Sequence, residues 1–288
     1  MSRTKATFIG FVAVLLWALL ALFTAASGAV PPFQLAAMSF TIATCVGIVG
    51  FAVKGSGFSG LRQPWKVWLL GIAGLFGYHF FYFTALRNAP PVEAGLIAYL
   101  WPLLIVLFSA LLPGEKLGWH HIVGALLGLA GAALIVTGGK GFTLQAEFSF
   151  GYAMALVCAL TWSGYSVLSR KFADVPTDVV TGFCAATAVL SLLCHLALEQ
   201  TVWPQTPLEW LAIAGLGLGP VGLAFYVWDY GVKNGDIQVL GAASYAAPLL
   251  STFALIITGY AGFTWAIGLA CLLITGGAVL AAKDMLFS

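Results

Sequence analysis

Two stretches of the sequence, 146 residues apart, share one pattern: GLIAYLWPLL at residues 95–104 and GAASYAAPLL at residues 241–250. Tyr99 matches Tyr245, and Pro102 matches Pro248. Each stretch lies within an apolar run of about 20 residues, the length at which an α-helix crosses the hydrocarbon core of a membrane. A tyrosine and a proline repeated at one depth of two such runs predict an internally duplicated membrane protein.

Other matches extend the duplication over most of the chain. Trp17 and Trp162, and Pro31 and Pro176, are 145 residues apart, and Asn88 and Asn234 are 146 apart. The offset covers five predicted spans. An odd number of spans makes the two halves enter the membrane in opposite directions, which is typical of secondary transporters. We expect a first repeat over residues 1–143 and a second, inverted repeat over residues 144–288.

The composition agrees with a membrane protein. Of 288 residues, 61% are hydrophobic and only 8% are charged, against roughly 25% charged in a soluble domain. Continuous apolar runs such as 96–112 lack the alternation of a membrane β-barrel. We expect an all-α polytopic protein whose ten transmembrane helices surround a central cavity. The predicted spans are 7–26, 33–53, 65–86, 92–112, 119–137, 150–170, 179–198, 208–231, 237–258 and 262–282.

The basic residues predict the orientation. With ten spans, ten of the twelve Lys and Arg residues fall on the side that holds both termini, and only Arg87 and Lys140 fall on the other. Cytoplasmic loops carry the excess of Lys and Arg, so both termini are expected in the cytoplasm. The first span resembles a signal peptide, but it belongs to the repeat, and we expect it to remain as a membrane helix.

Polar aromatic residues gather near the middle of the predicted spans. An interfacial aromatic belt would place them at span ends instead, and buried hydroxyl and indole groups need hydrogen-bond partners. For any single aromatic, packing between helices is an equal alternative; as a set, they favour a solute cavity. His79, at the same depth, is a candidate for binding the solute or a proton. The alternative is a structural histidine whose ring is buried and hydrogen-bonded within the protein. The candidate solute-binding residues are Trp17, Tyr78, His79, Tyr82, Tyr99, Trp101, Trp162, Ser244 and Tyr245.

Pro102 and Pro248 lie near the centres of the fourth and ninth spans. Proline removes a backbone donor and clashes with the carbonyl four residues earlier, and such irregularity is tolerated in a membrane where protein or a cavity satisfies the freed group. The matched pair favours two hinges beside the solute over simple packing kinks.

The remaining charged and small residues suggest structural roles. Asp229 and Lys233 have i,i+4 spacing, which favours a local ion pair, whereas Arg87 and Glu93 are expected to snorkel or pair at the other face. Small residues in the fifth and tenth spans, such as Gly124 and Gly276-Gly277, suit close helix packing. If this packing lies inside the fold, the protein is a monomer, which we expect. If it lies at a subunit interface, the protein is a dimer, which is the alternative.

No motif favours another class of function. The chain lacks G-x-S-x-G, H-E-x-x-H and P-loop sequences and a central carboxylate pair, so we do not expect an enzyme. It also lacks the carbonyl filter or charged ring of a channel. The five cysteines form no C-x-x-C pair, and we expect neither a metal nor a cofactor. The scattered basic residues predict no nucleic-acid partner.

One run of motifs resembles a known family. Ala85-Leu86, Ala94, Tyr99-Leu100-Trp101-Pro102, Gly114-Glu115-Lys116-Leu117, Gly124 and Gly131 resemble the EamA-type repeat of the drug/metabolite transporter superfamily. The second half is similar more faintly, through Gly241 and Pro248. Lys5-Ala6-Thr7, Trp228 and Ser244-Tyr245 resemble amino acid exporters within it. The resemblance implies an inner-membrane exporter of neutral, including aromatic, amino acids. A transporter of a drug, a nucleotide-linked sugar or another metabolite is the alternative.

Overall fold

The computed structural model describes residues 2–55, 57–259 and 262–287, and every regular element in these ranges is helical. Within these ranges, nine helical segments are long and apolar enough to cross a membrane. They are Arg3–Ala26, Pro32–Lys54, Trp65–Asn88, Pro91–Ser109, Trp119–Thr137, Ala146–Phe172, Thr177–Leu198, Pro207–Asn234 and Ile237–Ile257. A tenth apolar helix, α15 (Trp265–Ala281), has 17 residues. At about 1.5 Å per residue it is roughly 26 Å long, close to the thickness of the hydrocarbon core. The predicted fold class is confirmed.

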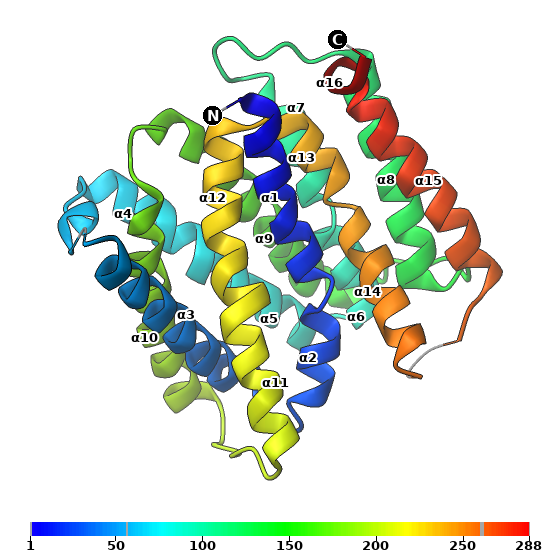
Figure 1. Cartoon of the computed structure of the whole chain (residues 1–288). Coiled ribbons are helices and arrows are strands. Elements are labelled where there is room, and N and C mark those ends of the chain that lie inside the picture. Colours follow the sequence, from blue (N-terminus) through cyan, green and yellow to red (C-terminus); the bar gives the residue numbers. More distant parts are fainter. Residues whose placement is uncertain (1, 56, 260–261, 288) are drawn as a thin grey trace.

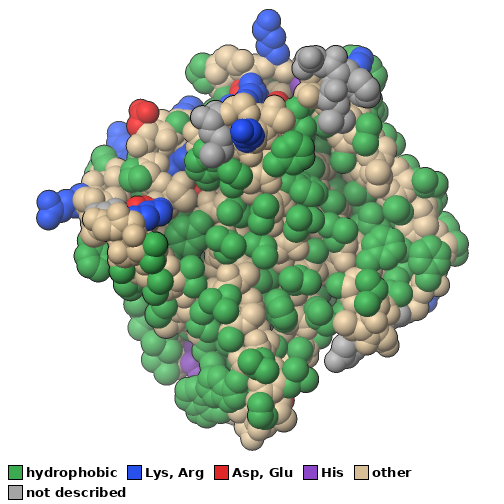
Figure 2. All heavy atoms as spheres, in the orientation of Figure 1, with side chains coloured by type: hydrophobic (Ala, Val, Ile, Leu, Met, Phe, Trp, Pro, Cys, Tyr) green, Lys and Arg blue, Asp and Glu red, His purple; other side chains and the backbone are tan. Residues whose placement is uncertain are grey.

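The outer surface of the bundle is apolar. Leu, Val, Ile and Phe side chains cover the sides of the molecule, while Lys and Arg gather toward one end (Figure 2). Both ends of the described chain lie at that end (Figure 1). A surface with so few charges suits lipid as its solvent.

Several spans begin and end where local sequence signals require. α3 (Pro32–Lys54) and α8 (Trp119–Thr137) end at Gly55 and Gly138, whose φ angles of 65° and 59° are left-handed. Glycine adopts this conformation without steric cost and is the usual residue after a helix. α11 (Pro207–Leu218) begins with Thr206 accepting from the Glu209 N–H, a normal N-cap.

The two repeats carry matched helix breaks. α6 (Pro91–Ala98) and α7 (Trp101–Ser109) are separated by Tyr99 and Leu100. In the second repeat α13 (Ile237–Ala243) and α14 (Ala246–Ile257) are separated by Ser244 and Tyr245. Pro102 and Pro248 lie in the first turns after the breaks, where proline is tolerated because no intrahelical donor is lost. The backbone irregularity predicted from these prolines is present, and its use as a hinge stays a prediction.

A second matched irregularity was not predicted from the sequence, although Gly219-Pro220 marks one of its two positions. The third span contains a π-helical turn, η2 (Ala73–Gly77), between α4 (Trp65–Ile72) and α5 (Tyr78–Asn88). The eighth span contains another, η6 (Gly219–Leu223), between α11 and α12 (Ala224–Asn234). The offset of 146 residues is the same as that of Pro102 and Pro248. Such turns free a backbone carbonyl and are common at functional sites.

The first and sixth spans break the symmetry. α1 (Arg3–Trp17) and α2 (Leu20–Ala26) are separated by Ala18 and Leu19. Their counterpart α9 (Ser149–Ser169) runs without interruption through Trp162. The seventh span consists of η5 (Thr177–Val179) and α10 (Val180–Leu198). The short elements η3 (Ala146–Phe148) and η4 (Arg170–Phe172) flank α9, and the remaining elements are η1 (Ser59–Leu61) and α16 (Lys283–Phe287).

The small residues of the fifth and tenth spans pack against each other. A Cβ added to Gly277 of α15 would lie 2.5 Å from the carbonyl oxygen of Gly124 on α8, and one added to Gly131 would lie 2.6 Å from Ile274 Cγ1. The adjacent Gly276 has no atom within 4 Å of such a Cβ. Close backbone approach replaces the hydrophobic effect as the source of helix association in lipid.

We expect Gly277→Val to destabilise the protein by about 3 kcal/mol, because the branched side chain forces α8 and α15 apart. Gly276→Val is the matched control, with the same change one residue earlier and no neighbour to displace. Thermal unfolding of the purified protein in detergent measures both. Equal melting temperatures for the two variants would contradict the packing described here.

Candidate functional site

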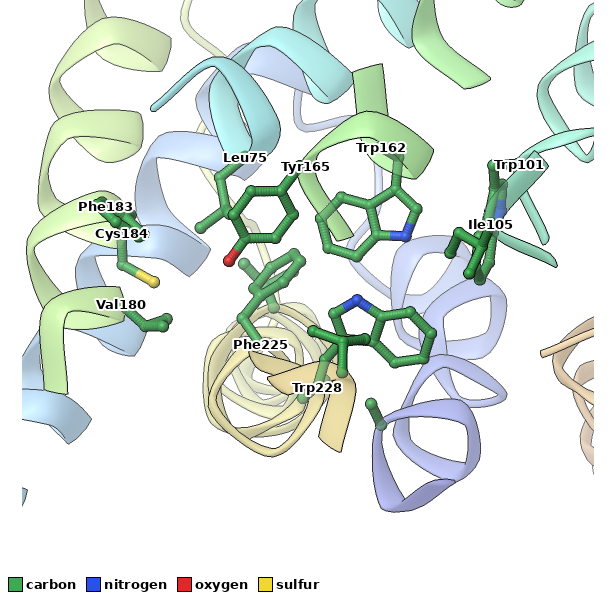
Figure 3. Packing of buried hydrophobic residues seen from close by; sticks show 14 of the residues in the cluster. Leu75, Trp101, Ile105, Trp162, Tyr165, Val180, Phe183, Cys184, Phe225 and Trp228 are labelled. Atoms are coloured by element: carbon green, nitrogen blue, oxygen red, sulfur yellow. The ribbon is translucent and has the colours of Figure 1, made fainter. Parts of the chain in front are cut away.

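Four tryptophans from four different spans meet in the middle of the bundle. They are Trp17 at the end of α1, Trp101 at the start of α7, Trp162 in α9 and Trp228 in α12. All six pairs are in ring contact, with centroids 5.0–6.4 Å apart. Figure 3 shows three of them with Phe225 beside Trp162 and Trp228. We call these four residues the tryptophan tetrad; each repeat contributes two of its members.

Two of the four indole N–H groups donate hydrogen bonds within the protein. Trp17 Nε1 donates to the Pro220 carbonyl in the π-turn η6 at 3.1 Å, and Trp228 Nε1 donates to Ser166 Oγ at 3.0 Å. Among the described residues, Trp101 and Trp162 have no such acceptor. Trp101, Trp162 and Trp228 are buried, whereas Trp17 is half-buried. The tetrad therefore leaves the indole donors of Trp101 and Trp162 unused.

Three tyrosines adjoin the tetrad and stay partly exposed. Tyr78 and Tyr82 on α5 stack at 6.0 Å, and Tyr78 contacts Trp162 at 5.6 Å. Tyr99, in the break between α6 and α7, lies near the Tyr82 hydroxyl. All three are half-buried although each has neighbours in the interior. The structure thus brings Trp17, Tyr78, Tyr82, Tyr99, Trp101 and Trp162 together, and their role in solute binding stays a prediction.

His79 joins the same group through aromatic neighbours. Its ring meets Phe40 at 5.1 Å, Tyr78 at 5.3 Å and Phe225 at 6.3 Å. Nδ1 lies 2.7 Å from the carbonyl oxygen of Leu75, in the π-turn η2. A carbonyl only accepts, so Nδ1 carries the proton and Nε2 of the neutral ring is a bare acceptor. The π-turn thereby sets the tautomer of His79.

Ser244 and Tyr245 lie elsewhere. Tyr245 is fully buried against Gly128 of α8, and its hydroxyl accepts from the Leu103 N–H at 3.2 Å. That N–H belongs to the first turn of α7, which has no intrahelical acceptor. Ser244 is also buried and donates to the Leu240 carbonyl. These two residues support the helix breaks and do not join the tetrad, so the sequence-based placement of both beside the solute does not match this geometry.

Sequence reasoning missed Trp228, Phe225 and Phe40 as members of the central cluster. Trp228 was singled out only for the family resemblance. A usable signal existed, because Trp228 and Tyr82 are 146 residues apart. Applying the repeat offset to each predicted site residue would have pointed to Trp228 and, from His79, to Phe225.

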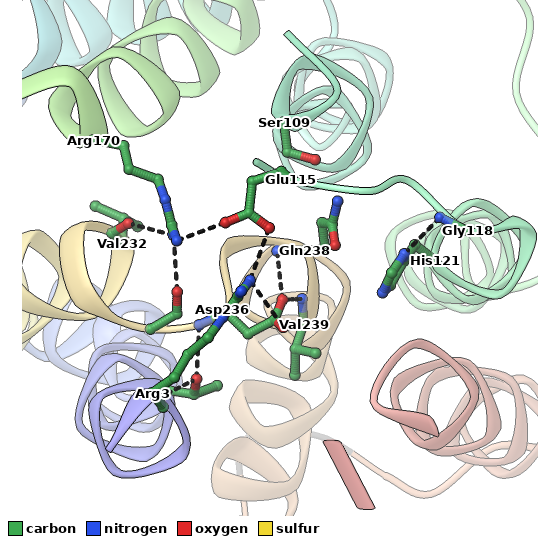
Figure 4. A network of polar contacts seen from close by, with 12 residues as sticks. Arg3, Ser109, Glu115, Gly118, His121, Arg170, Val232, Asp236, Gln238 and Val239 are labelled. Carbon is green, nitrogen blue, oxygen red and sulfur yellow. Dashed lines mark hydrogen bonds and ion pairs between the residues drawn. The ribbon is translucent and has the colours of Figure 1, made fainter. Parts of the chain in front are cut away.

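A charge network ties the two repeats together at the basic end (Figure 4). The Glu115 carboxylate binds Arg3 of α1 at 2.8 Å and Arg170 of η4 at 2.6 Å. Arg170 also donates to the carbonyls of Val232 and Gly235, and Arg3 reaches Asp236 at 3.2 Å. We call Arg3, Glu115, Arg170 and Asp236 the basic-end latch. It joins residues that lie far apart in the chain and so holds the helices of both repeats together at this end of the bundle.

Two further ion pairs involve Arg87 and Asp229. Arg87 binds Glu199 at 2.6 Å, and Glu199 also accepts from the backbone N–H groups of Phe33 and Gln34. The partner of Arg87 is therefore Glu199, not Glu93, because the end of α10 lies over the start of α3. Asp229 and Lys233 form the predicted i,i+4 pair at 2.9 Å, and Thr177 donates to the same carboxylate oxygen.

The described residues form ten apolar helical segments in two opposed repeats, which share an uncharged aromatic centre and are joined by ion pairs at one end. This is the arrangement of an inverted-repeat membrane transporter. Models of the EamA-like transporter family match residues 4–137 and 149–282. The chain therefore belongs to the EamA-like transporter family.

Individual relatives resemble almost the whole chain. A protein of Ancylobacter novellus named aromatic amino acid exporter YddG is 59% identical over 284 residues, 98% of each chain. A protein of the same name from Escherichia coli (strain K12) is 27% identical over 292 residues, 97% of each chain. A solved crystal structure 57% identical in sequence superposes with a TM-score of 0.95 and covers 100% of this chain and 99% of the other.

Proposed function

We propose that this protein exports neutral amino acids, aromatic ones among them, across a bacterial inner membrane. The tryptophan tetrad carries the proposal, because it offers flat faces for an apolar or aromatic side chain beside uncharged hydroxyl and indole groups. The names of the relatives support the same solute class. The match to the EamA-like transporter family supports a carrier rather than an enzyme. The small-residue faces of α8 and α15 are used within one chain, which supports a monomer.

Alternating access follows from the differences between the repeats. Trp17 donates to Pro220 in η6, and the matched pair is Trp162 with Gly74 in η2. In the described structure Tyr165 packs on Gly74 instead. Exchanging the conformations of the two repeats would form the Trp162–Gly74 bond, release Trp17 and open the basic-end latch. Pro102 and Pro248 would act as the hinges. The site then faces one side of the membrane at a time.

Another solute of the superfamily is the second candidate. A nucleotide-linked sugar carries phosphates, which require Arg or Lys beside the site. In the described part of the chain, the basic residues with known contacts bind carboxylates and carbonyls away from the tetrad. The geometry therefore favours neutral or zwitterionic solutes over anionic ones.

Transport in liposomes tests the function. We expect purified protein to carry phenylalanine, threonine or methionine down its own gradient without an imposed pH gradient, because proton coupling needs titratable groups at mid-depth and His79 is the main one there. Empty liposomes are the control. The uncoupled model is wrong if flux appears only with an imposed pH gradient. If His79→Ala also abolishes this dependence on the gradient, His79 is the proton carrier.

Fusions to the C-terminus test the orientation. The basic end of the bundle, where both described chain ends lie, is expected to face the cytoplasm. A fluorescent protein that matures only in the cytoplasm should be bright when fused after Ser288. Activity of a phosphatase that works only in the periplasm, fused at the same position, would contradict this orientation.

A further inference from the structure

The two repeats differ in polarity at the positions that meet beside the tetrad. Tyr78, His79 and Tyr82 of α5 correspond, at the offset of 146 residues, to Ala224, Phe225 and Trp228 of α12. The first set offers two hydroxyl groups and an imidazole; the second is hydrocarbon apart from the indole N–H of Trp228, which Ser166 already accepts. The centre thus has a polar side on α5 and an apolar side on α12.

The polar side contains an acceptor that the protein leaves unused. His79 Nδ1 is committed to the Leu75 carbonyl, so Nε2 of the neutral ring accepts. No donor among the described residues bonds to this atom. The atom is also not fully enclosed by the protein. The matched residue in the second repeat, Phe225, has no such group. An unpaired acceptor that the protein does not fully enclose suits a ligand N–H.

No fixed charge competes for this position. Asp229 follows Trp228 in the sequence, but its carboxylate is bound by Lys233 and Thr177. Glu199 is bound by Arg87 and by two backbone N–H groups. Within the described residues that surround His79, the ring neighbours are Phe40, Tyr78, Phe83 and Phe225. An ammonium group there meets one neutral nitrogen acceptor and aromatic faces, both of which attract cations.

We infer that His79 determines specificity by accepting a hydrogen bond from the solute ammonium group, with the solute side chain directed toward Phe225 and the tetrad. The inference rests on the proposed function, since it assigns the two ends of an amino acid to the two sides of the site. It predicts selection for a free amino group rather than for a carboxylate. Glutamine at position 79 keeps an acceptor, and phenylalanine keeps a ring without one.

Binding of three related compounds separates this role from a structural one. Phenylalanine has both end groups, 2-phenylethylamine lacks the carboxylate, and 3-phenylpropionate lacks the amino group. In purified protein, quenching of tryptophan fluorescence or calorimetry gives each dissociation constant. We expect His79→Phe to weaken the first two about tenfold or more, as loss of a hydrogen bond to a charged group implies, and to change the third less than twofold. His79→Gln should restore most of the loss.

Phe81→Leu is the matched control on α5, since the ring of Phe81 contacts Phe80 and not His79. Equal losses for all three compounds in His79→Phe would show a structural role and overturn the inference. So would unchanged binding of phenylalanine by that variant. Failure of the wild-type protein to bind or carry phenylalanine would overturn the proposed function, and the inference with it.

Discussion

Trp162→Ala and Trp101→Ala are each expected to reduce transport of aromatic amino acids by at least tenfold while the protein still inserts into the membrane. Each residue contacts the other three members of the tetrad, and Trp162 also contacts Tyr78 and Phe225. Losing two aromatic contacts to a solute ring removes about 2 kcal/mol, a factor of roughly 30 in affinity.

Trp65→Ala is the matched control, because Trp65 is 68% exposed at the start of α4. The measurement is counterflow of labelled phenylalanine in liposomes, with insertion checked by size-exclusion chromatography of the solubilised protein. Trp162→Phe should retain part of the activity, since it keeps a ring. Normal transport by both alanine variants would remove the tetrad from the solute path.

Glu115→Ala is expected to open the basic end of the molecule. The Glu115 side chain is 6% exposed and bridges Arg3 and Arg170. Without this carboxylate, Arg170 loses its ion pair and Arg3 keeps only Asp236. The two guanidinium groups then repel each other with less compensation. Breaking a buried ion pair costs about 3–5 kcal/mol, and we expect about 2 kcal/mol here because Arg3 is half exposed to solvent. The equilibrium between closed and open forms should shift by roughly 30-fold.

Cysteine labelling measures this shift. In a background without the five native cysteines, Tyr99→Cys reports access to the centre from each side of the membrane. Inverted vesicles expose the cytoplasmic side to a membrane-impermeant maleimide, and we expect faster labelling there in Glu115→Ala. Lys116→Gln, the exposed neighbouring residue, is the control. Unchanged labelling rates would show that the latch does not hold this end closed.

Much of the fold was predictable because its signals are local. Hydropathy sets where each span begins and ends, since lipid requires a continuous apolar helix. The helix breaks before Trp101 and Ala246 lie where Pro102 and Pro248 predicted irregularity. The ion pair of Asp229 and Lys233 was also predictable, because i,i+4 residues share one helix face. Each of these features depends on neighbours within one or two turns.

The sequence predicted fewer of the contacts between spans. Tyr99 and Tyr245 match in the repeat, yet only Tyr99 joins the centre, because Tyr245 turns toward α8 and caps α7. Arg87 pairs with Glu199, which is 112 residues away. Neither choice is visible in hydropathy, since it depends on how each helix is rotated about its axis.

By itself, the sequence determined the all-α fold class, the approximate ends of the apolar helices and the duplication. Only the tertiary structure decided that four tryptophans form one cluster, that Trp228 and Phe225 complete it, and that Leu75 directs His79. The physical reason is the range of the forces involved. Transfer into lipid and backbone hydrogen bonding act residue by residue along a helix, whereas ring contacts and ion pairs between helices depend on the packing of the whole bundle.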